Sequence, residues 1–273
     1  MIRAGLHGRT GVDRVVTTAL ISQASQRVSP LAKLRVVLIG AGALVSTLFV
    51  APAQVFADDI GFSCPMLYYH DVPSQAGLEA QLNTLIRSGY RPTTISAVLD
   101  ALGGETPPPP GCIVLTFDDA LRSQHRNALP VLSRWAVNGT FFMMPSFRDG
   151  VHVYMTPEEI QEVAVSGMEI GSHTLNHASL PALRRANLGA FFAEIIVSRS
   201  QIENLIGRPV DLFAYPNGAV DAPTAAEIES AGYRGAATTI QGAWQTSNLR
   251  YYLRRYPANS WEAPSEILTR IRS

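Results

Sequence analysis

The feature that most constrains the fold is the alternation, after about residue 60, of short apolar runs with longer helix-like stretches. The run CIVLTF at 112–117 is apolar almost throughout, as in a strand buried on both faces of a parallel sheet. Strands that alternate with helices form a mostly parallel sheet with right-handed crossovers. Six or seven such units suit a small or incomplete barrel. The predicted strands are 65–70, 112–117, 140–144, 168–172, 211–215 and 234–238.

Helices are predicted between these strands, and one of them has clear start and stop signals. Thr156 is a typical N-cap, Pro157 suits the first helical position, and Gly167 ends the helix. No internal repeat or second domain is visible, so we expect one α/β domain. The predicted helices are 77–88, 94–102, 124–137, 157–166, 186–206 and 222–231.

Two polar motifs stand where two of these strands end. Asp118 and Asp119 follow CIVLTF, and His173 follows MEIGS with His177 four residues later. Carboxyl ends of parallel strands are where α/β folds place their sites. Two imidazoles and one carboxylate form a zinc ligand set that leaves coordination positions open, and the second carboxylate is then free to act as a base. Each motif alone is common, but together they indicate a metal-dependent hydrolase.

The two cysteines that follow the N-terminal segment have a matching placement. Cys64 lies six residues before His70, and Cys112 lies six residues before Asp118. If the two strands are parallel neighbours in register, the cysteines pair at one end and His70 meets Asp118 at the other. We therefore predict a disulfide between Cys64 and Cys112, with two buried free thiols as the alternative.

The N-terminal segment resembles a targeting sequence. Residues 36–53 are mostly apolar, basic residues precede them, and Val-Phe-Ala at 55–57 precedes Asp58. This layout predicts a secretory signal peptide cleaved after Ala57. An uncleaved membrane anchor over 36–53 is the alternative, because about 18 apolar residues can just span a bilayer. The protein is thus expected to be periplasmic, secreted or anchored, with membrane contact only through this segment.

The domain division follows from that segment. Residues 1–57 are expected to be a tail and signal peptide, and 58–273 a catalytic domain. The first 57 residues hold six of the 22 basic and one of the 22 acidic side chains, so the remainder has a net charge of about −5. It shows no basic patch interleaved with aromatic residues, and nucleic acid is therefore not an expected partner.

The catalytic part of the chain resembles the polysaccharide deacetylases of carbohydrate esterase family 4, over roughly residues 64–260. The likeness rests on VLTFDDA at 114–120, ALPVL at 128–132, GTFF at 139–142, MEIGSHTLNH at 168–177 and FAYPNG at 213–218, and MLYYHDV at 66–72 is similar to the start of a bacterial subgroup. The resemblance implies a distorted (β/α) barrel of about seven parallel strands. It also implies metal-assisted removal of an acetyl group from a glycan such as poly-N-acetylglucosamine, peptidoglycan or a chitin-like polymer.

The resemblance also implies roles for individual residues. Asp118 would be the general base, and Asp119, His173 and His177 would hold a divalent metal, usually Zn2+ and sometimes Co2+ or Ni2+. A backbone N–H at Asn217 would stabilise the oxyanion. Three further positions are expected near the substrate: Tyr215 and Pro216, which precede Asn217, and Trp244.

Two departures from the family pattern lead to further candidates. Many members have an arginine that orients the catalytic aspartate where this chain has Ala214. Arg255 is the predicted substitute, with a solvated surface arginine as the alternative. The family usually carries a late Leu-x-His acid, but no histidine follows His177. His70 is the predicted acid, with a structural core histidine as the alternative.

These departures keep two other functions open beside the N-deacetylase. One is an O-acetyl esterase, because an alkoxide leaves more readily than an amine anion. The other is a glycan-binding protein without activity, although retention of the full Asp–Asp–His–His set favours an enzyme.

Overall fold

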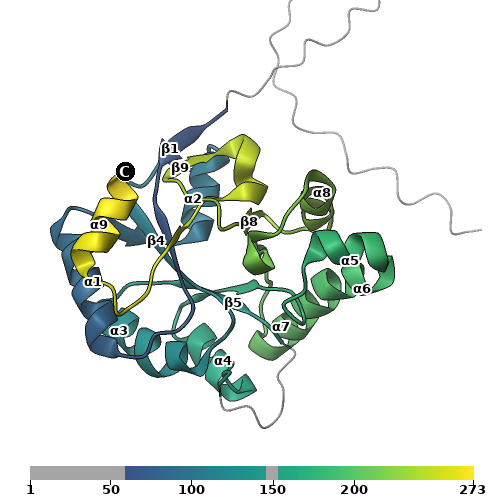
Figure 1. The fold of residues 1–273 in the computed structure, drawn as a ribbon, viewed down its shortest axis with the longest axis horizontal. Coiled ribbons are helices and arrows are strands. Elements are labelled where there is room, and N and C mark those ends of the chain that lie inside the picture. Colours follow the sequence, from purple (N-terminus) through teal and green to yellow (C-terminus); the bar gives the residue numbers. More distant parts are fainter. Residues whose placement is uncertain (1–58, 146–152) are drawn as a thin grey trace, which may run out of the picture. The chain divides into compact units, whose positions relative to one another are not determined.

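The computed structural model describes residues 59–145 and 153–273, in which parallel strands and helices alternate as the sequence predicts (Figure 1). The main sheet is curled, and every pairing in it is parallel. Its strand order is β10-β2-β4-β5-β6-β7-β8, with β3 paired beside the start of β4. The strands are β2 (Met66–Tyr69), β3 (Arg91–Thr93), β4 (Cys112–Phe117), β5 (Thr140–Met143), β6 (Glu169–Ser172), β7 (Leu212–Ala214), β8 (Gly235–Ala237) and β10 (Tyr256–Pro257).

A short C-terminal segment brings the curled sheet back to its first strand. Leu253 forms a parallel bridge with Ala237 of β8, and three residues later β10 begins and pairs with β2. The row of strands therefore closes into a distorted barrel, which confirms the predicted fold class. The closing segment was not predicted, because β10 has only two residues and no apolar run marks it.

Most helices match the predicted positions, but two of the predicted helices are divided. The one at 186–206 is three consecutive pieces with a π-helical turn in the middle, and the one at 124–137 is a π-helical turn followed by a helix that ends at residue 134. Helices at 180–186 and 264–272 were not predicted. The Thr156 cap and a reciprocal bond from Glu159 are present at the start of the helix at 157. The helices are α1 (Gln75–Arg87), α2 (Ile95–Leu102), η1 (Gln124–Ala128), α3 (Leu129–Arg134), α4 (Pro157–Val165), α5 (Leu180–Ala186), α6 (Leu188–Phe192), η2 (Ala193–Val197), α7 (Ser198–Ile206), α8 (Ala222–Ser230) and α9 (Pro264–Arg272).

Alternate residues of the strands enter two separate apolar clusters, one on each face of the sheet. Leu115 and Phe117 pack with the surrounding helices in the larger cluster. Met66 and Val114 belong to the smaller cluster, in which α2 supplies Val98 and three other apolar side chains. The larger cluster includes side chains of the surrounding helices, so it lies on the outer face of the sheet. The smaller cluster therefore fills the inside of the barrel, and α2 closes the amino-terminal end of the barrel. The first turn of α2 is held by the carboxylate of Glu169, which accepts from the backbone N–H groups of Ile95 and Ser96 at 3.0 and 3.1 Å.

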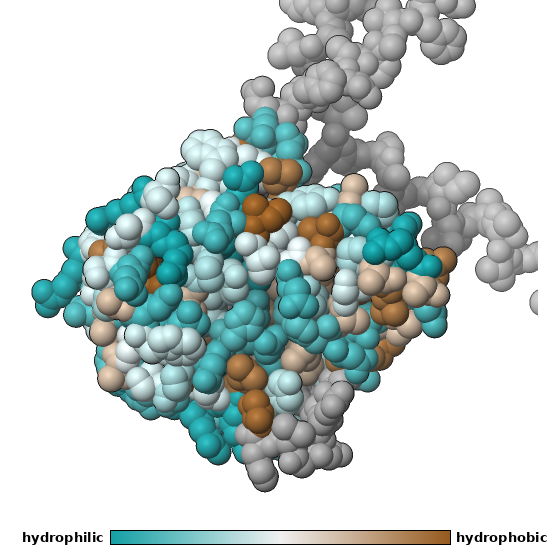
Figure 2. All heavy atoms as spheres, viewed as in Figure 1, coloured by the Kyte–Doolittle hydropathy of each residue, from teal (hydrophilic) through white to brown (hydrophobic). Residues whose placement is uncertain are grey.

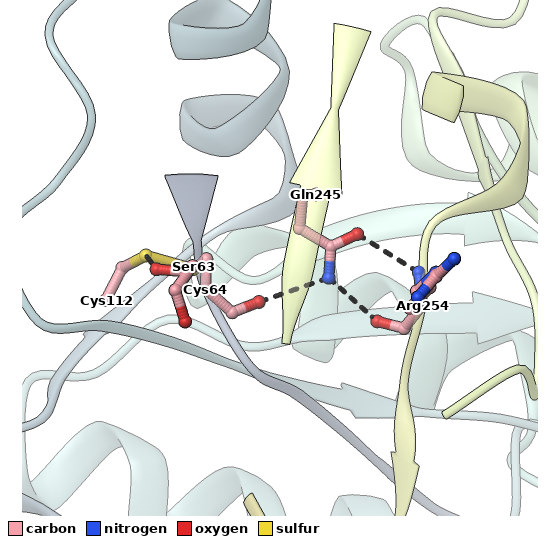
Figure 3. The surroundings of a disulfide bond; sticks show 5 residues. All are labelled: Ser63, Cys64, Cys112, Gln245 and Arg254. Carbon is pink, nitrogen blue, oxygen red and sulfur yellow. Dashed lines mark hydrogen bonds between the residues drawn. A yellow bond between two sulfur atoms is a disulfide. The ribbon is translucent and has the colours of Figure 1, made fainter. Parts of the chain in front are cut away.

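The predicted disulfide lies at the same amino-terminal end (Figure 3). Cys64 and Cys112 are bonded, with Cα atoms 5.2 Å apart and a sequence separation of 48. The amide nitrogen of Gln245 donates to the carbonyls of Cys64 and Arg254, at 3.2 and 2.9 Å. Gln245 belongs to β9 (Trp244–Thr246), which pairs antiparallel with β1 (Gly61–Ser63) in a separate small sheet. This end of the barrel is thus held by covalent and polar links.

The surface and the N-terminal segment add two plain findings. On the face shown in Figure 2, apolar side chains form small separate patches among polar ones. Among the described residues, no helix has the length and apolar character needed to span a bilayer. The predicted signal peptide or anchor, its cleavage after Ala57 and the rest of 1–57 lie outside the described residues.

Candidate metal and catalytic centre

The predicted site residues converge at the carboxyl-terminal edge of the barrel. His70 follows β2, Asp118 and Asp119 follow β4, and His173 and His177 follow β6. The pairing of β2 with β4 holds the offset that the cysteine spacing predicts, since Met66 is opposite Val114 and Tyr69 opposite Phe117. Because parallel strands end at one edge, residues far apart in sequence share one site.

Asp119, His173 and His177 form a cluster that could hold a metal ion. Their ligand atoms all lie within 4.8 Å of one another. Oδ1 of Asp119 is 3.4 Å from Nε2 of His173 and 3.4 Å from Nε2 of His177. This oxygen is buried and has no hydrogen-bond partner among the described residues. A shared cation would satisfy the oxygen and both ring nitrogens at once, so the donor set fits a divalent metal.

The orientation of His173 is fixed by its other ring nitrogen. Nδ1 lies 2.8 Å from the carbonyl oxygen of Ala214 in β7. A carbonyl can only accept, so Nδ1 carries a proton and donates it, and Nε2 is the ring nitrogen turned toward Asp119. A metal-binding imidazole usually donates its other ring N–H in this way, to a carbonyl oxygen or a carboxylate.

The remaining two ligands also have suitable charge states. Burial lowers the pKa of His177, and the neighbouring His173 lowers it further, so the ring favours the neutral form. Burial raises the pKa of Asp119, but the adjacent His173 more than offsets this, and the carboxyl pKa lies below its usual value. A neutral imidazole and an ionised carboxylate are the forms that bind metal.

Asp118 is held by a buried arginine. Both its oxygens accept from Arg255, each at 2.8 Å, and Arg255 also donates to Thr116 at 2.9 Å and to the carbonyl of Thr238 at 2.9 Å. The side chain of Arg255 is 0% exposed, and its guanidinium lies 4.9 Å from the centre of the Tyr68 ring. Arg255 therefore contacts the aspartate as predicted, and the alternative prediction of a solvated surface arginine is wrong.

The arginine also sets the charge of Asp118. Burial raises the pKa of this carboxyl, but the positive charge of Arg255 acts in the opposite direction, helped by His173, and the pKa ends below its usual value. Asp118 is thus an ionised, rigidly oriented carboxylate next to the metal cluster.

His70 reaches the site by a different contact from the one expected. Its Nε2 lies 3.8 Å from Oδ2 of Asp119, and its side chain is 48% exposed. The expected partner was Asp118, which is opposite His70 in the strand register, but Arg255 occupies both Asp118 oxygens. Because it is half exposed, His70 is not the structural core histidine of the alternative interpretation.

The segment after β7 places one of its three predicted residues at the surface. Asn217 is exposed and has φ of 56°, three residues after the carbonyl of Ala214 that holds His173. Tyr215 and Pro216 are buried, and the Tyr215 ring packs in the outer apolar cluster against Phe213. The side chain of Tyr215 is therefore a core group that cannot touch a substrate.

Trp244 is far from this edge, so its predicted place beside the site is wrong. It is opposite Ser63 in the small β1–β9 sheet, at the amino-terminal end of the barrel. Ser63 lies seven residues before His70, which is about 23 Å along an extended strand. The Gly/Gln-rich sequence around Trp244 marked a loop, but it could not show at which end of the barrel the loop packs.

Sequence reasoning missed two buried polar residues that brace the site. The amide of Gln124 donates to the carbonyls of His70 and Asp118, at 2.7 and 2.5 Å, and so joins the ends of β2 and β4. Glu194 accepts from backbone N–H groups between the two histidines. A charged residue inside the apolar run AFFAEIIV was the only available signal for Glu194.

Backbone strain is concentrated at the same edge. Among the described residues, six that are not glycine have positive φ, and four of these lie in the two metal-binding motifs. They are Asp119, Ala120, Thr174 and His177. Such conformations cost about 1–3 kcal/mol each and cluster at functional sites.

Comparison with known proteins agrees with this geometry. The sequence profile described as polysaccharide deacetylase matches residues 105–236, which contain both aspartates and both histidines. The chain is also 28% identical, over 70% of its own length and 70% of the relative's, to the Bacillus subtilis (strain 168) protein named "Putative polysaccharide deacetylase YxkH". This chain belongs to the polysaccharide deacetylase family. As a member, it is a hydrolase of the class acting on carbon–nitrogen bonds other than peptide bonds.

Two further polysaccharide deacetylase comparisons concern a shorter region and the fold. The poly-β-1,6-N-acetyl-D-glucosamine N-deacetylase of Escherichia coli (strain K12) is 31% identical over 116 residues, which are 37% of this chain and 17% of that protein. The structure of a Streptococcus pyogenes deacetylase in complex with acetate superposes with a TM-score of 0.68 and 22% identity, over 78% of this chain and 99% of the other. This last likeness supports the barrel fold.

Proposed function

We propose that this polysaccharide deacetylase removes acetyl groups from an N-acetylated glycan with the help of a divalent metal held by Asp119, His173 and His177. The observation that carries the proposal is the three-residue cluster, with the buried Oδ1 of Asp119 facing two ring nitrogens, beside the Arg255-bound Asp118. Zinc is the ion we propose first, and cobalt or nickel suit the same donors.

When bound, the metal supplies a Lewis acid that polarises the acetyl carbonyl and makes water more acidic. Asp118 takes the proton of the attacking water. Its ionised form persists at neutral pH because Arg255 lowers its pKa, and the two-point contact fixes the direction of its lone pairs. A base fixed in this way needs little reorganisation during the reaction.

The other roles belong to residues at the rim of the site. The backbone N–H of Asn217 is proposed to donate to the oxyanion, because it is on the exposed turn next to the His173 contact. His70 is proposed to protonate the leaving amine, since it is half exposed and 3.8 Å from Asp119. Solvent exposure lets such a residue regain its proton after each turnover.

The substrate proposal rests on family membership and on the name of a relative. The Escherichia coli relative is named for a poly-β-1,6-linked N-acetylglucosamine polymer, and we extend N-acetylglucosamine polymers as a class to this chain. Peptidoglycan and chitin-like polymers are in that class. The open rim around exposed Asn217 and half-exposed His70 suits a polymer that lies across the site.

An exported location completes the proposal. The disulfide between Cys64 and Cys112 requires an oxidising compartment to persist. The signal-like sequence before residue 58 supports the same conclusion.

The test is acetate release by the purified protein with added zinc or cobalt. Substrates are N-acetylglucosamine oligomers and an O-acetylated xylan, and Asp118→Asn is the blank. Acetate from the oligomers that disappears in the variant supports the proposal. Acetate from the xylan alone would replace it with an O-acetyl esterase, and metal-loaded protein that binds glycan but releases no acetate from either would replace it with a binding protein.

A further inference from the structure

Glu194 is a buried carboxylate whose hydrogen-bond partners all lie in one turn of the metal site. The residue is 6% exposed. Its Oε2 accepts from the backbone N–H groups of Leu175 and Asn176, both at 2.8 Å, and its Oε1 accepts from the side-chain amide of Asn176, also at 2.8 Å. No cation lies within ion-pair distance of it in the part of the chain that the structure describes. Three N–H donors therefore stabilise this buried charge.

The turn that Glu194 holds joins the two histidines of the cluster. It is a strained turn, because Thr174 and His177 have φ of 66° and 60°. Strained backbone persists only where neighbouring groups fix it. The bonds to Leu175 and Asn176, midway between the strained residues, are placed to do so.

The two histidines differ in how they are otherwise held. His173 is fixed directly, since its backbone N–H donates to Met143 and its ring donates to Ala214. His177 has no comparable contact to a main-chain carbonyl among the described residues, and its ring is 33% exposed. The position of its Nε2 therefore depends on the turn, and through the turn on Glu194.

The helix that carries Glu194 is locally rebuilt around it. Residues 193–197 form the π-helical turn η2 between α6 and α7. The hydroxyl of Ser198 lies 2.7 Å from the carbonyl oxygen of Glu194, which accepts its proton. Turns of this kind are rare and are often found at functional sites. Here the turn points a glutamate inward from an otherwise apolar run.

We propose that Glu194 is a positioning residue that sets the second histidine ligand of the metal site. The proposal rests on the proposed function, because it assumes that Asp119, His173 and His177 bind a metal. Glu194 does not touch the ion or the substrate. It acts through the backbone of Leu175 and Asn176, and its loss should weaken metal binding before it unfolds the barrel.

The test compares metal binding by the wild type with that of three variants. Glu194→Ala removes all three acceptor bonds. Glu194→Gln keeps an oxygen for both backbone donors, and the Asn176 amide can rotate to meet its nitrogen. Glu203→Ala is the matched control, because Glu203 also accepts a backbone N–H, from Val210 at 2.9 Å, but lies further along the same helical run and away from the site.

The readouts are zinc affinity by competition with a coloured chelator, the visible spectrum of the cobalt form, and amide exchange at Leu175 and Asn176 in the metal-free protein. We expect Glu194→Ala to weaken zinc binding about 10- to 100-fold, to change the cobalt spectrum and to speed exchange at both amides. Glu194→Gln should lie closer to the wild type, and Glu203→Ala should match it.

The possible failures can be told apart. Equal zinc affinity and an unchanged cobalt spectrum in folded Glu194→Ala would overturn the positioning role and leave the proposed function intact. The same loss in Glu203→Ala would also overturn it, because the effect would then be general loosening of the helix. If the wild type bound no metal, the proposed function would fail and the inference with it.

Discussion

The two ends of the barrel are built from the same strands but in opposite ways. At the amino-terminal end, β2 and β4 are joined by the Cys64–Cys112 disulfide, and α2 fills the opening with apolar side chains. At the carboxyl-terminal end, the same two strands lead to His70 and Asp118, where buried charges and left-handed backbone are concentrated. One end is arranged for stability and the other carries the strain of a site.

The difference shows how a small barrel can hold a costly site. A buried ion pair contributes little net stability, and positive φ costs free energy at several positions. A disulfide that closes a 48-residue separation restricts the unfolded chain instead, at a place where no chemistry is needed. Substitutions at the two ends should therefore separate activity from stability.

The largest expected effect is on activity, at the carboxyl-terminal end. Asp118→Asn should reduce acetate release about 10²- to 10⁴-fold, because it removes the proposed base while it keeps the size of the side chain. Zinc content should not change. Asp71→Asn is the control, since Asp71 is a neighbouring carboxylate that bonds to Ser123. Equal loss in the two variants would show that Asp118 has no special role.

The second effect is on stability, at the same carboxyl-terminal end. Arg255→Ala should lower the free energy of unfolding by about 3–5 kcal/mol, because it leaves Asp118 charged and buried without its partner. Urea unfolding measures this change. The double variant Arg255→Ala with Asp118→Asn should recover part of the loss, since the orphan charge is gone. A double variant less stable than Arg255→Ala would contradict this account of the pair.

The third effect belongs to the amino-terminal end. Replacement of Cys64 and Cys112 by alanine should lower the free energy of unfolding by about 2–4 kcal/mol. Acetate release should stay within about twofold of the wild type at temperatures where the variant is folded, because the strand pairing still places the site. A large loss of turnover in the folded variant would mean that the two ends are coupled.

The smallest effect is expected at Trp244, also at the amino-terminal end. Trp244→Ala should change the free energy of unfolding by about 0.5 kcal/mol or less, as surface substitutions usually do. KM and kcat on glycan oligomers should be unchanged, because β9 pairs with β1 away from the site. A raised KM would place a substrate contact at this end of the barrel.

The sequence predicted the elements whose signals are local and continuous. β4 has the predicted bounds because CIVLTF is apolar almost throughout, and the equal cysteine spacings correctly predicted the disulfide and the β2–β4 register. Arg255 was predicted as the substitute for the arginine that the family pattern has where this chain has Ala214, and it does bind Asp118. The strand and the disulfide needed only residue type and spacing, whereas Arg255 needed the family resemblance.

The missed features depend on packing that spacing does not encode. Trp244 was placed at the wrong end because β9 pairs antiparallel with β1, and neither short strand has an apolar pattern. Gln124 and Glu194 lie in π-helical turns, so their inward direction departs from the ordinary helical period. His70 contacts Asp119 because Arg255 has already taken both oxygens of Asp118.

The central claim is that Asp119, His173 and His177 hold one metal ion that acetate release requires. Protein stripped with a chelator should be titrated with zinc, and bound zinc and acetate release from N-acetylglucosamine oligomers should be measured together. The account predicts that activity returns in proportion to bound zinc and reaches its maximum at one ion per chain, and that His173→Ala neither binds the ion tightly nor regains activity. Full acetate release by the stripped protein, or zinc-dependent release by His173→Ala equal to the wild type, would contradict it.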